Sequence, residues 1–246
     1  MSITCPFCHN NHSIFQWETT DLKNQTWTLY QCQACHFYFL NPFPTPKQLE
    51  EAYTQDYYGA GEKKFSFPLV ENVLDFFRSG RARKLNNYLN KNTSSFILDV
   101  GCGNGRFLYY LQKIGLKNLY GIELPGNSAE RASKIPFLNI KIEEIEHAHY
   151  PADFFDAITM FHVLEHMKNP IQILQKMTSW LKDEGIFMVS FPNIASKQAQ
   201  KYRGMWLHMD PPRHLNFITP NDFIRHMNQL GFEHIESSYF SLEQNP

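Results

Sequence analysis

Three glycines follow a short apolar run in residues 96–105, and their spacing is typical of a ligand-binding turn. Residues 96–100 predict a buried parallel strand, and residues 106–115 predict a helix that ends at a glycine. A strand, a turn with Gly101, Gly103 and Gly105, and a helix bring backbone N–H groups close to a bound ligand. The spacing differs from the dinucleotide fingerprint, and Asp99 before the first glycine repels a pyrophosphate but suits a cationic ligand.

A second acid occurs where a nucleoside would need it. Residues 118–123 predict another strand, which ends at Glu123. A carboxylate at the end of this strand can accept hydrogen bonds from both ribose hydroxyls of a nucleoside. Together with Asp99 and the glycine turn, Glu123 predicts a site for a nucleoside that carries a positive charge.

These residues resemble motif I and the following acidic position of the class I S-adenosylmethionine-dependent methyltransferases. The resemblance extends from about residue 45 onward and implies an α/β fold, Rossmann-like and doubly wound, with a mostly parallel sheet. It also implies that S-adenosylmethionine lies across the glycine turn, with an acidic residue after the third strand meeting the adenine. The cofactor-binding residues that it implies are Asp99, Gly101, Gly103, Gly105, Glu123, Glu143 and Phe161. Glu144 is the alternative to Glu143, and a solvated pair of glutamates on a surface turn is the alternative to both.

Four cysteines at the start of the chain have the spacing of a metal site. They form two C-x-x-C pairs, separated by a strand-rich stretch. Two tight turns that each present two thiolates complete a tetrahedron around Zn²⁺, so the pattern predicts a structural zinc ribbon. The alternatives are two disulfides, or reduced thiols without a metal. The predicted ligands are Cys5, Cys8, Cys32 and Cys35.

Several histidines follow the predicted fourth strand, residues 153–160, and the predicted fifth strand, residues 186–191. The Leu-Glu-His element with Asn-Pro after it resembles many small-molecule methyltransferases, and it follows His162, the residue best placed to face a methyl group. The stretch from Trp206 to Leu215 resembles methyltransferases of polysaccharide and antibiotic-sugar pathways. It offers His214 as a second candidate base and Arg213 as a planar group for a phosphate or carboxylate. The alternative for Arg213 and His214 is a pair that anchors its loop, and His166 is either catalytic or structural.

The overall composition limits the classes of function. The formal net charge of −1 argues against a dedicated nucleic-acid binder, which usually carries a basic surplus. The sequence has no charged head followed by an apolar run at its start and no stretch long enough to cross a bilayer. We therefore expect a cytoplasmic protein in which thiols stay reduced. The oligomeric state is not predicted.

The chain divides by composition into three ranges. Residues 1–44 form the zinc-ribbon-like segment, residues 45–92 contain a Pro-rich linker and helices expected to cover the cofactor, and residues 93–246 form the methyltransferase domain. A helix begins at Pro46, a long helix covers residues 69–90 with a possible break at Ser79 and Gly80, and residues 195–218 form a long loop. A sixth strand is expected at residues 232–239. The seventh, antiparallel strand of the resembled fold has no residues left to form it.

The sequence therefore predicts methyl transfer from S-adenosylmethionine to a small-molecule acceptor, such as a sugar or nucleotide-sugar. One alternative is an RNA methyltransferase whose zinc ribbon binds RNA. The other is a non-catalytic relative in which the ribbon is an interaction module.

Overall fold

The computed structural model describes residues 3–53 and 68–239. The predicted loop after residue 58 and the pair Tyr57 and Tyr58 lie outside the described residues. The chain divides into two compact units. The first consists of residues 1–57, 162–175 and 190–235, and the second of residues 58–161, 176–189 and 236–246. This division by contact crosses the sequence-based ranges 1–44, 45–92 and 93–246, because later segments pack with the N-terminal one.

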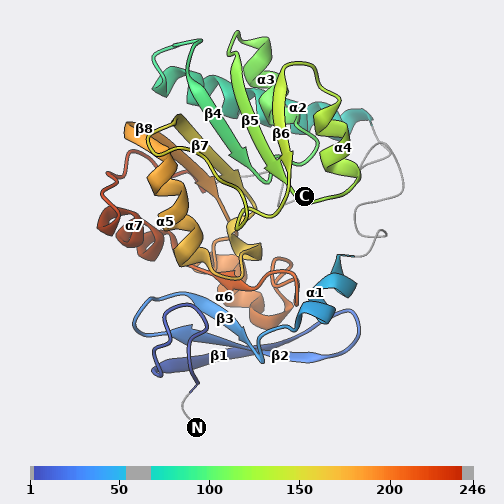
Figure 1. Cartoon of the computed structure of the whole chain (residues 1–246). Coiled ribbons are helices and arrows are strands. Elements are labelled where there is room, and N and C mark those ends of the chain that lie inside the picture. The colour runs from blue at the N-terminus through green and yellow to red at the C-terminus, as the bar shows by residue number, and fades with distance from the viewer. Residues whose placement is uncertain (1–2, 54–67, 240–246) are drawn as a thin grey trace. The chain divides into compact units, whose positions relative to one another are not determined.

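The second unit is built on a five-stranded sheet with the order β6-β5-β4-β7-β8 (Figure 1). The four strands β4 to β7 are parallel to one another, and β8 lies at the edge beside β7. Because the strand order reverses at β4, this sheet has the topological switch point of a Rossmann-like α/β fold, as predicted. The strands are β4 (Phe96–Val100), β5 (Asn118–Glu123), β6 (Leu138–Ile142), β7 (Phe155–Phe161) and β8 (Leu181–Ser190).

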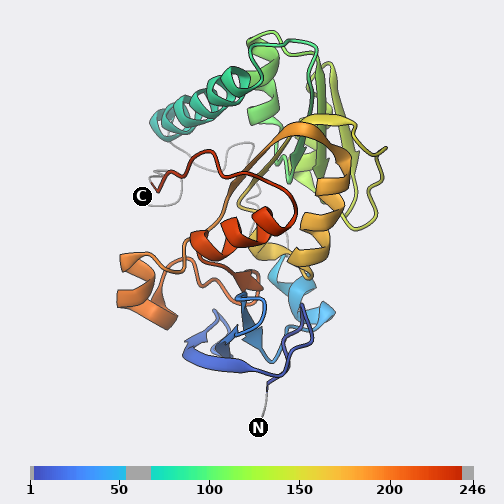
Figure 2. The same cartoon turned by 90° about the vertical axis from the view of Figure 1, so that its left-hand side faces the viewer.

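Helices α2 (Pro68–Tyr88), α3 (Arg106–Lys113) and α4 (Asn127–Ser133) bury apolar side chains against these strands. Figures 1 and 2 show α2 and α3 running along one face of the sheet. Leu108 and Leu111 of α3 are fully buried, as the amphipathic spacing of that helix requires. The shared core fixes where α3 begins, and therefore where the glycine turn before it lies.

Two expectations about secondary structure were wrong. Helix α2 continues through Ser79 and Gly80 without a break, because one glycine costs only about 1 kcal/mol in a helix that is otherwise packed. Residues 232–239 form no strand, although their sequence has β-propensity. Nearly all of their side chains are exposed, and a strand needs a hydrogen-bonded neighbour and a buried face to be stable.

The first unit contains a four-stranded antiparallel sheet with the order β1-β2-β3-β9. The strands are β1 (Ser13–Thr20), β2 (Thr26–Cys32), β3 (Tyr38–Asn41) and, from a distant part of the chain, β9 (Asn216–Phe217). Cys5 and Cys8 precede β1, Cys32 ends β2, and Cys35 lies in the turn before β3. Phe39 pairs with Asn216 and Tyr38 with Phe217. The N-terminal sheet is therefore completed by a segment that the sequence placed in a loop.

The predicted loop 195–218 is in fact largely ordered as short elements. It contains α6 (Lys197–Tyr202), the short helix η2 (Arg203–Met205) and β9. Their apolar side chains pack with those of β1 to β3 in a second core. This structure was not predicted because its partners lie far away in the sequence. The members of this core are Trp17, Trp27, Leu29, Leu40, Ile194, Ala199, Trp206, Met209 and Phe217.

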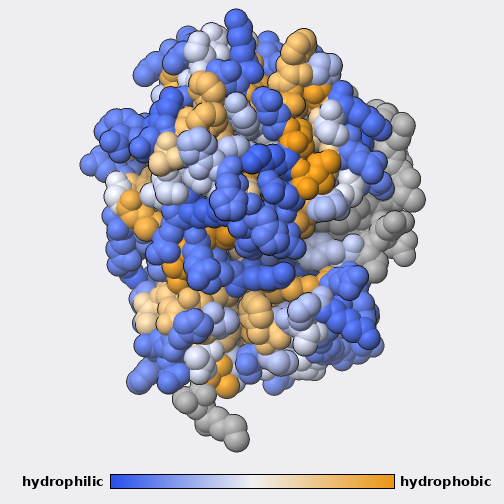
Figure 3. Space-filling view, in the orientation of Figure 1, coloured by the Kyte–Doolittle hydropathy of each residue, from blue (hydrophilic) through white to orange (hydrophobic). Residues whose placement is uncertain are grey.

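The remaining helices of the described chain are short. α1 (Pro46–Ala52) begins at Pro46, as predicted. The hydroxyl of Thr45, the residue before it, caps the helix by accepting from the N–H of Gln48. α5 (Pro170–Trp180) precedes β8, α7 (Pro220–Gln229) follows β9, and the short helix η1 (Leu164–His166) follows β7. Within the described residues, no helix has the length and apolar character that crossing a bilayer requires. On the face drawn in Figure 3, hydrophobic residues form small groups separated by hydrophilic ones.

Candidate active site

The glycine turn after β4 has a backbone that favours glycine at three positions. Gly101, Gly103 and Gly105 have φ angles of 68°, 57° and 73°, in the left-handed region. The N–H groups of Gly101 and Cys102 both donate to the carbonyl oxygen of Ile122, at 2.8 and 3.1 Å. The turn is therefore fixed to the end of β5, the strand that carries Glu123.

Glu123 and the glycine turn are brought together as the sequence indicated. The N–H of Gly103 donates to Glu123 Oε2 at 2.6 Å, and the N–H of Leu124 donates to Oε1 at 3.1 Å. Burial raises the pKa of Glu123, while these two N–H groups act in the opposite direction. A carboxylate held beside the turn in this way fits the ribose of a nucleoside, so these residues suit S-adenosylmethionine.

Asp99 is buried, with 3% of its surface exposed. The hydroxyl of Thr159 on β7 donates to Asp99 Oδ1 at 2.6 Å. Burial raises the pKa of Asp99 to about 7, and the charge of Glu123 adds to this effect. Asp99 is therefore held inside the unit by a hydrogen bond from β7, and its contact with the cofactor stays a prediction.

Glu143 and Phe161 lie at the ends of β6 and β7. The N–H of Glu143 donates to the carbonyl oxygen of Glu123 at 3.0 Å, whereas Glu144 is exposed. The ring of Phe161 packs edge-on against Phe107, with centroids 5.0 Å apart. Glu143 is thus the glutamate fixed beside the predicted ribose-binding acid, and Phe161 is partly packed into the core. Their cofactor contacts stay predictions.

The four N-terminal cysteines converge in the first unit. Their sulfur atoms all lie within 4.8 Å of one another, and all four thiols are free. The Cys5–Cys35 and Cys8–Cys32 sulfur pairs are 3.6 and 3.5 Å apart. A Zn–S bond of about 2.3 Å in a tetrahedron puts the sulfurs about 3.8 Å apart, so the cluster fits a zinc ion.

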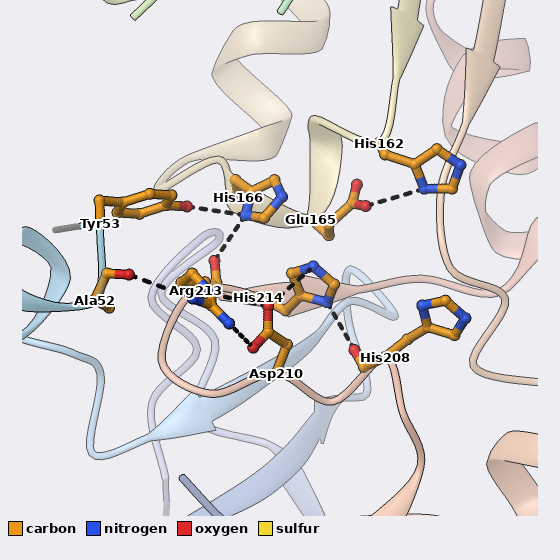
Figure 4. Close-up of polar contacts among 9 residues, drawn as sticks. All are labelled: Ala52, Tyr53, His162, Glu165, His166, His208, Asp210, Arg213 and His214. Carbon is orange, nitrogen blue, oxygen red and sulfur yellow. Dashed lines mark hydrogen bonds and ion pairs between the residues drawn. The ribbon is translucent and has the colours of Figure 1, made fainter. Parts of the chain in front are cut away.

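A polar cluster in the first unit contains the predicted catalytic histidines (Figure 4). We call it the histidine cluster, and it comprises Tyr53, His162, Glu165, His166, Asp210, Arg213 and His214. His162 follows β7 directly, with a left-handed φ of 55°, and its N–H donates to the carbonyl oxygen of Ser190 at 2.9 Å. This backbone contact fixes the direction in which the imidazole leaves the chain.

The carboxylate of Glu165 faces His162 within this cluster. His162 Nδ1 lies 3.4 Å from Glu165 Oε1, and only 2% of the Glu165 surface is exposed. Burial acts to raise the pKa of Glu165, but His162 and the imidazoles of His166 and His214 bring the pKa below its usual value. Glu165 is therefore positioned to carry a negative charge next to His162.

His166 and His214 each use Nδ1 on a backbone carbonyl. His166 Nδ1 lies 3.0 Å from the carbonyl oxygen of Arg213 and 2.9 Å from the hydroxyl of Tyr53. His214 Nδ1 lies 2.7 Å from the carbonyl oxygen of His208. Because a carbonyl only accepts, Nδ1 carries the hydrogen in both rings. Burial lowers the pKa of His214 to about 4, with the charge of His166 adding to the effect.

Arg213 is occupied by a neighbour in its own loop. Its guanidinium forms a two-pronged ion pair with Asp210, and Nη1 contacts the carbonyl oxygen of Ala52 at 3.4 Å. This arrangement favours the loop-anchoring alternative for Arg213 over the binding of a free phosphate. The side chain connects the His214 loop to the end of α1.

Sequence reasoning did not assign a role to three residues of this region. Glu165 lies three residues after His162, which is one turn of a helix and the pattern that could have indicated the pair. Tyr53 contacts His166 from a distant segment, so nothing local predicts it. Asn216 is buried, and its amide donates to the carbonyl oxygens of Leu164 and Met167 at 2.9 and 3.0 Å. It holds η1, and hence Glu165, in place.

The sheet order, the glycine turn after β4 and the acid that ends β5 are those of a class I S-adenosylmethionine-dependent methyltransferase. A comparison with protein families matches residues 73–237 to the family described as Methyltransferase domain. Since this match covers more than half of the sequence, the chain belongs to that methyltransferase family.

Curated proteins with similar sequences are also named as methyltransferases. The chain is 27% identical over 166 residues to a ubiquinone biosynthesis O-methyltransferase of Glaesserella parasuis, a match that covers 59% of this chain and 70% of that enzyme. It is 33% identical over 132 residues to the mitochondrial enzyme of that name from Saccharomyces cerevisiae, covering 51% of this chain and 42% of the yeast protein.

Solved structures show the fold. A methyltransferase from Mesorhizobium loti has a TM-score of 0.52 at 18% identity, covering 63% of this chain and 82% of that one. The plantazolicin methyltransferase BpumL with S-adenosylhomocysteine has a TM-score of 0.51 at 22% identity, covering 65% of each chain. The [4+2]-cyclase SpnF has a TM-score of 0.51 at 18% identity, covering 63% of this chain and 57% of that one. The fold is thus shared by different chemistries, and the acceptor must be argued from side chains.

Proposed function

We propose that this protein transfers a methyl group from S-adenosylmethionine to a hydroxyl oxygen of a small-molecule acceptor, with His162 as the general base. The observation that carries the proposal is the contact between His162 Nδ1 and the buried carboxylate of Glu165. A carboxylate on Nδ1 holds the proton there and leaves Nε2 as the basic atom. The names of the curated relatives support oxygen as the atom that is methylated.

The glycine turn and the end of β5 supply the binding groups of the proposed mechanism. The N–H groups of the glycine turn and the carboxylate of Glu123 would hold the nucleoside, and Glu143 would meet the adenine. When bound, S-adenosylmethionine supplies a methyl group on a sulfonium sulfur, and the transfer of this group needs alignment more than activation. The protein therefore has to position an oxygen nucleophile and remove its proton.

His162 is the proposed proton acceptor. Nε2 of His162 takes the hydroxyl proton as the oxygen–carbon bond forms and the sulfur–carbon bond breaks. The positive charge of the sulfonium would thereby be replaced by a positive charge on the imidazole. The carboxylate of Glu165, whose Oε1 lies 3.4 Å from Nδ1, stabilises this imidazolium by its charge. Release of the proton to solvent returns His162 to its neutral form.

The acceptor is a finer part of the proposal. A sugar or nucleotide-sugar follows from the resemblance of the stretch around Arg213 and His214, whereas the curated relatives are named for ubiquinone biosynthesis. We place both kinds of acceptor in one class, small-molecule oxygen acceptors. Incubation of metabolite extracts with labelled S-adenosylmethionine, followed by mass identification of the labelled product, distinguishes them.

Once the acceptor is identified, the role of His162 as the base can be tested with it. In His162→Gln we expect kcat to fall by about 10²–10⁴-fold, the usual contribution of a general base, while the affinity for S-adenosylmethionine measured by calorimetry stays the same. His149→Gln, a change at an exposed histidine, is the matched control. If His162→Gln retains the kcat of the wild type, the base is another group.

We also propose that the four cysteines hold a structural Zn²⁺. The free thiols and the sulfur distances support it. With four protein ligands the ion has no open position, so it stabilises the sheet and takes no part in methyl transfer.

A further inference from the structure

The histidine cluster contains three side chains that can share one cation. One ligand atom each from Glu165, His166 and His214 lies within 4.8 Å of the other two. Glu165 and His214 are buried, and His166 is half-buried. All three belong to the first unit, although His214 comes from a loop far along the chain.

The two imidazoles are already held as metal ligands are held. Each donates Nδ1–H to a backbone carbonyl, of Arg213 for His166 and of His208 for His214. A histidine that binds a metal through one ring nitrogen nearly always donates the other N–H to a carbonyl or carboxylate. Figure 4 shows that the Nε2 atoms of both rings lie on the side of Glu165. Their lone pairs are therefore available on that side.

The carboxylate of Glu165 has an oxygen without a partner. Oε1 faces His162, whereas Oε2 is buried and makes no hydrogen bond in the described structure. An unpaired carboxylate oxygen at 2% exposure costs free energy unless a cation or a donor meets it. Glu165 and the two imidazoles therefore offer one carboxylate and two nitrogen donors to a single cation.

We propose that Glu165, His166 and His214 bind a divalent transition-metal ion, distinct from the zinc of the cysteines. Two imidazoles and one carboxylate suit Zn²⁺, Co²⁺ or Fe²⁺ rather than Mg²⁺, which prefers oxygen ligands. At a metal–ligand distance of about 2.0–2.1 Å, a tetrahedral ion separates its ligand atoms by about 3.4 Å, so shifts of about 1 Å complete the site. Three protein ligands leave at least one position for a water or a hydroxyl oxygen.

The site goes beyond the proposed methyl transfer and is tested without it. Purified full-length protein that holds zinc in its cysteines is titrated with Co²⁺ and followed by absorption. We expect one further equivalent per chain with d–d bands and without thiolate-to-cobalt charge transfer, because the new ligands contain no sulfur. A wild-type protein that binds no further equivalent, or binds it with thiolate bands alone, overturns the proposal.

Variants then assign the ligands. In Glu165→Gln and His214→Gln we expect the affinity for this second Co²⁺ to fall by at least about 100-fold, more than loss of an outer hydrogen bond usually costs. His208→Gln is the matched control, since it changes a buried histidine of the same loop that meets His214 through its backbone carbonyl. Equal affinity in all three variants contradicts the proposal. Circular dichroism checks their folding, and the wild-type spectrum decides the question if a variant does not fold.

The outcome is separable from the proposed function. Calorimetry with S-adenosylmethionine reports on the glycine turn and Glu123, which belong to the other unit. Loss of Co²⁺ binding with unchanged cofactor affinity therefore concerns this site alone. Failure of the proposed function would instead appear as absent methyl transfer in a protein that still binds the second Co²⁺.

Discussion

Asp99 is held in surroundings that favour its protonated form. It is buried near the end of β4 and accepts a hydrogen bond from Thr159. The charge of the Glu123 carboxylate disfavours its ionised form. Its pKa is raised from an ordinary value of 3.8 to about 7. The folded chain therefore holds this proton more tightly than the unfolded chain does.

This difference predicts a dependence of stability on pH. Between pH ~4 and ~7 the folded state binds more protons than the unfolded state, so the free energy of unfolding falls as the pH rises, by up to about 4 kcal/mol for this group. In Asp99→Asn the amide stays neutral and its oxygen can still accept from Thr159. We expect the free energy of unfolding, measured with denaturant, to fall less between pH 5 and pH 8 in the variant than in the wild type. An equal fall in the two proteins would contradict this account.

At the scale of elements, the N-terminal sheet acts as a scaffold for the His214 loop. Strand β9 begins two residues after His214 and pairs with β3, and β3 follows the second cysteine pair. His226 of α7 contacts the carbonyl oxygen of Cys35 at 2.7 Å. The four N-terminal cysteines and the histidine cluster are therefore parts of one packed unit.

Removal of the zinc should disturb more than the first 44 residues. In Cys8→Ser we expect loss of the bound zinc and a loss of stability of several kcal/mol, because the metal closes two turns of a small sheet. Hydrogen exchange should increase at Tyr38, Phe39, Asn216 and Phe217 together. Faster exchange confined to residues 3–12 would show that the sheet does not depend on the metal. Cys102→Ser, a change outside the cluster, should keep its zinc content.

Gly204 marks a close approach between η2 and β1. A Cβ atom at this position would lie 1.8 Å from the carbonyl oxygen of Glu18, and Thr19 donates to the carbonyl oxygen of Gly204 at 2.7 Å. We expect Gly204→Ala to destabilise the protein by about 1–3 kcal/mol, since one backbone must move. Gly80→Ala is the control, because nothing lies within 4 Å of its Cβ position and alanine favours a helix. Equal melting temperatures for the two variants would argue against this packing.

The local patterns of the sequence were sufficient to place the glycine turn beside Glu123. The strand, glycine turn and helix from Phe96 onward are contiguous, and Glu123 ends the next strand, so the parallel sheet alone brings them together. The histidine cluster needed information that local patterns lack. Tyr53, Glu165 and His214 come from three separate segments, and β9 forms only because β3 offers an edge. Residues 232–239 show the reverse case, in which β-propensity without a neighbour gave no strand.

At the scale of the whole molecule, the charge distribution distinguishes the proposed function from RNA methylation. The formal net charge is −1, and residues 1–44 contain Lys23 as their sole lysine or arginine. RNA binding by the ribbon would require neutralising phosphates with basic side chains. In a filter-binding titration with total RNA we expect weak retention at low salt. Tight retention that decreases steeply with added salt would reverse the assignment in favour of an RNA acceptor.

The first unit is assembled from three separate stretches of the chain, and this has a consequence for synthesis on the ribosome. The first three strands emerge early, but their fourth strand and most of their apolar partners emerge only after the whole central region has been translated. Until then, Trp27, Leu29 and Leu40 lack the surface that covers them in the finished protein. The nascent chain therefore exposes an incomplete sheet edge and core for most of its translation, which is the condition under which chaperones bind and aggregation begins.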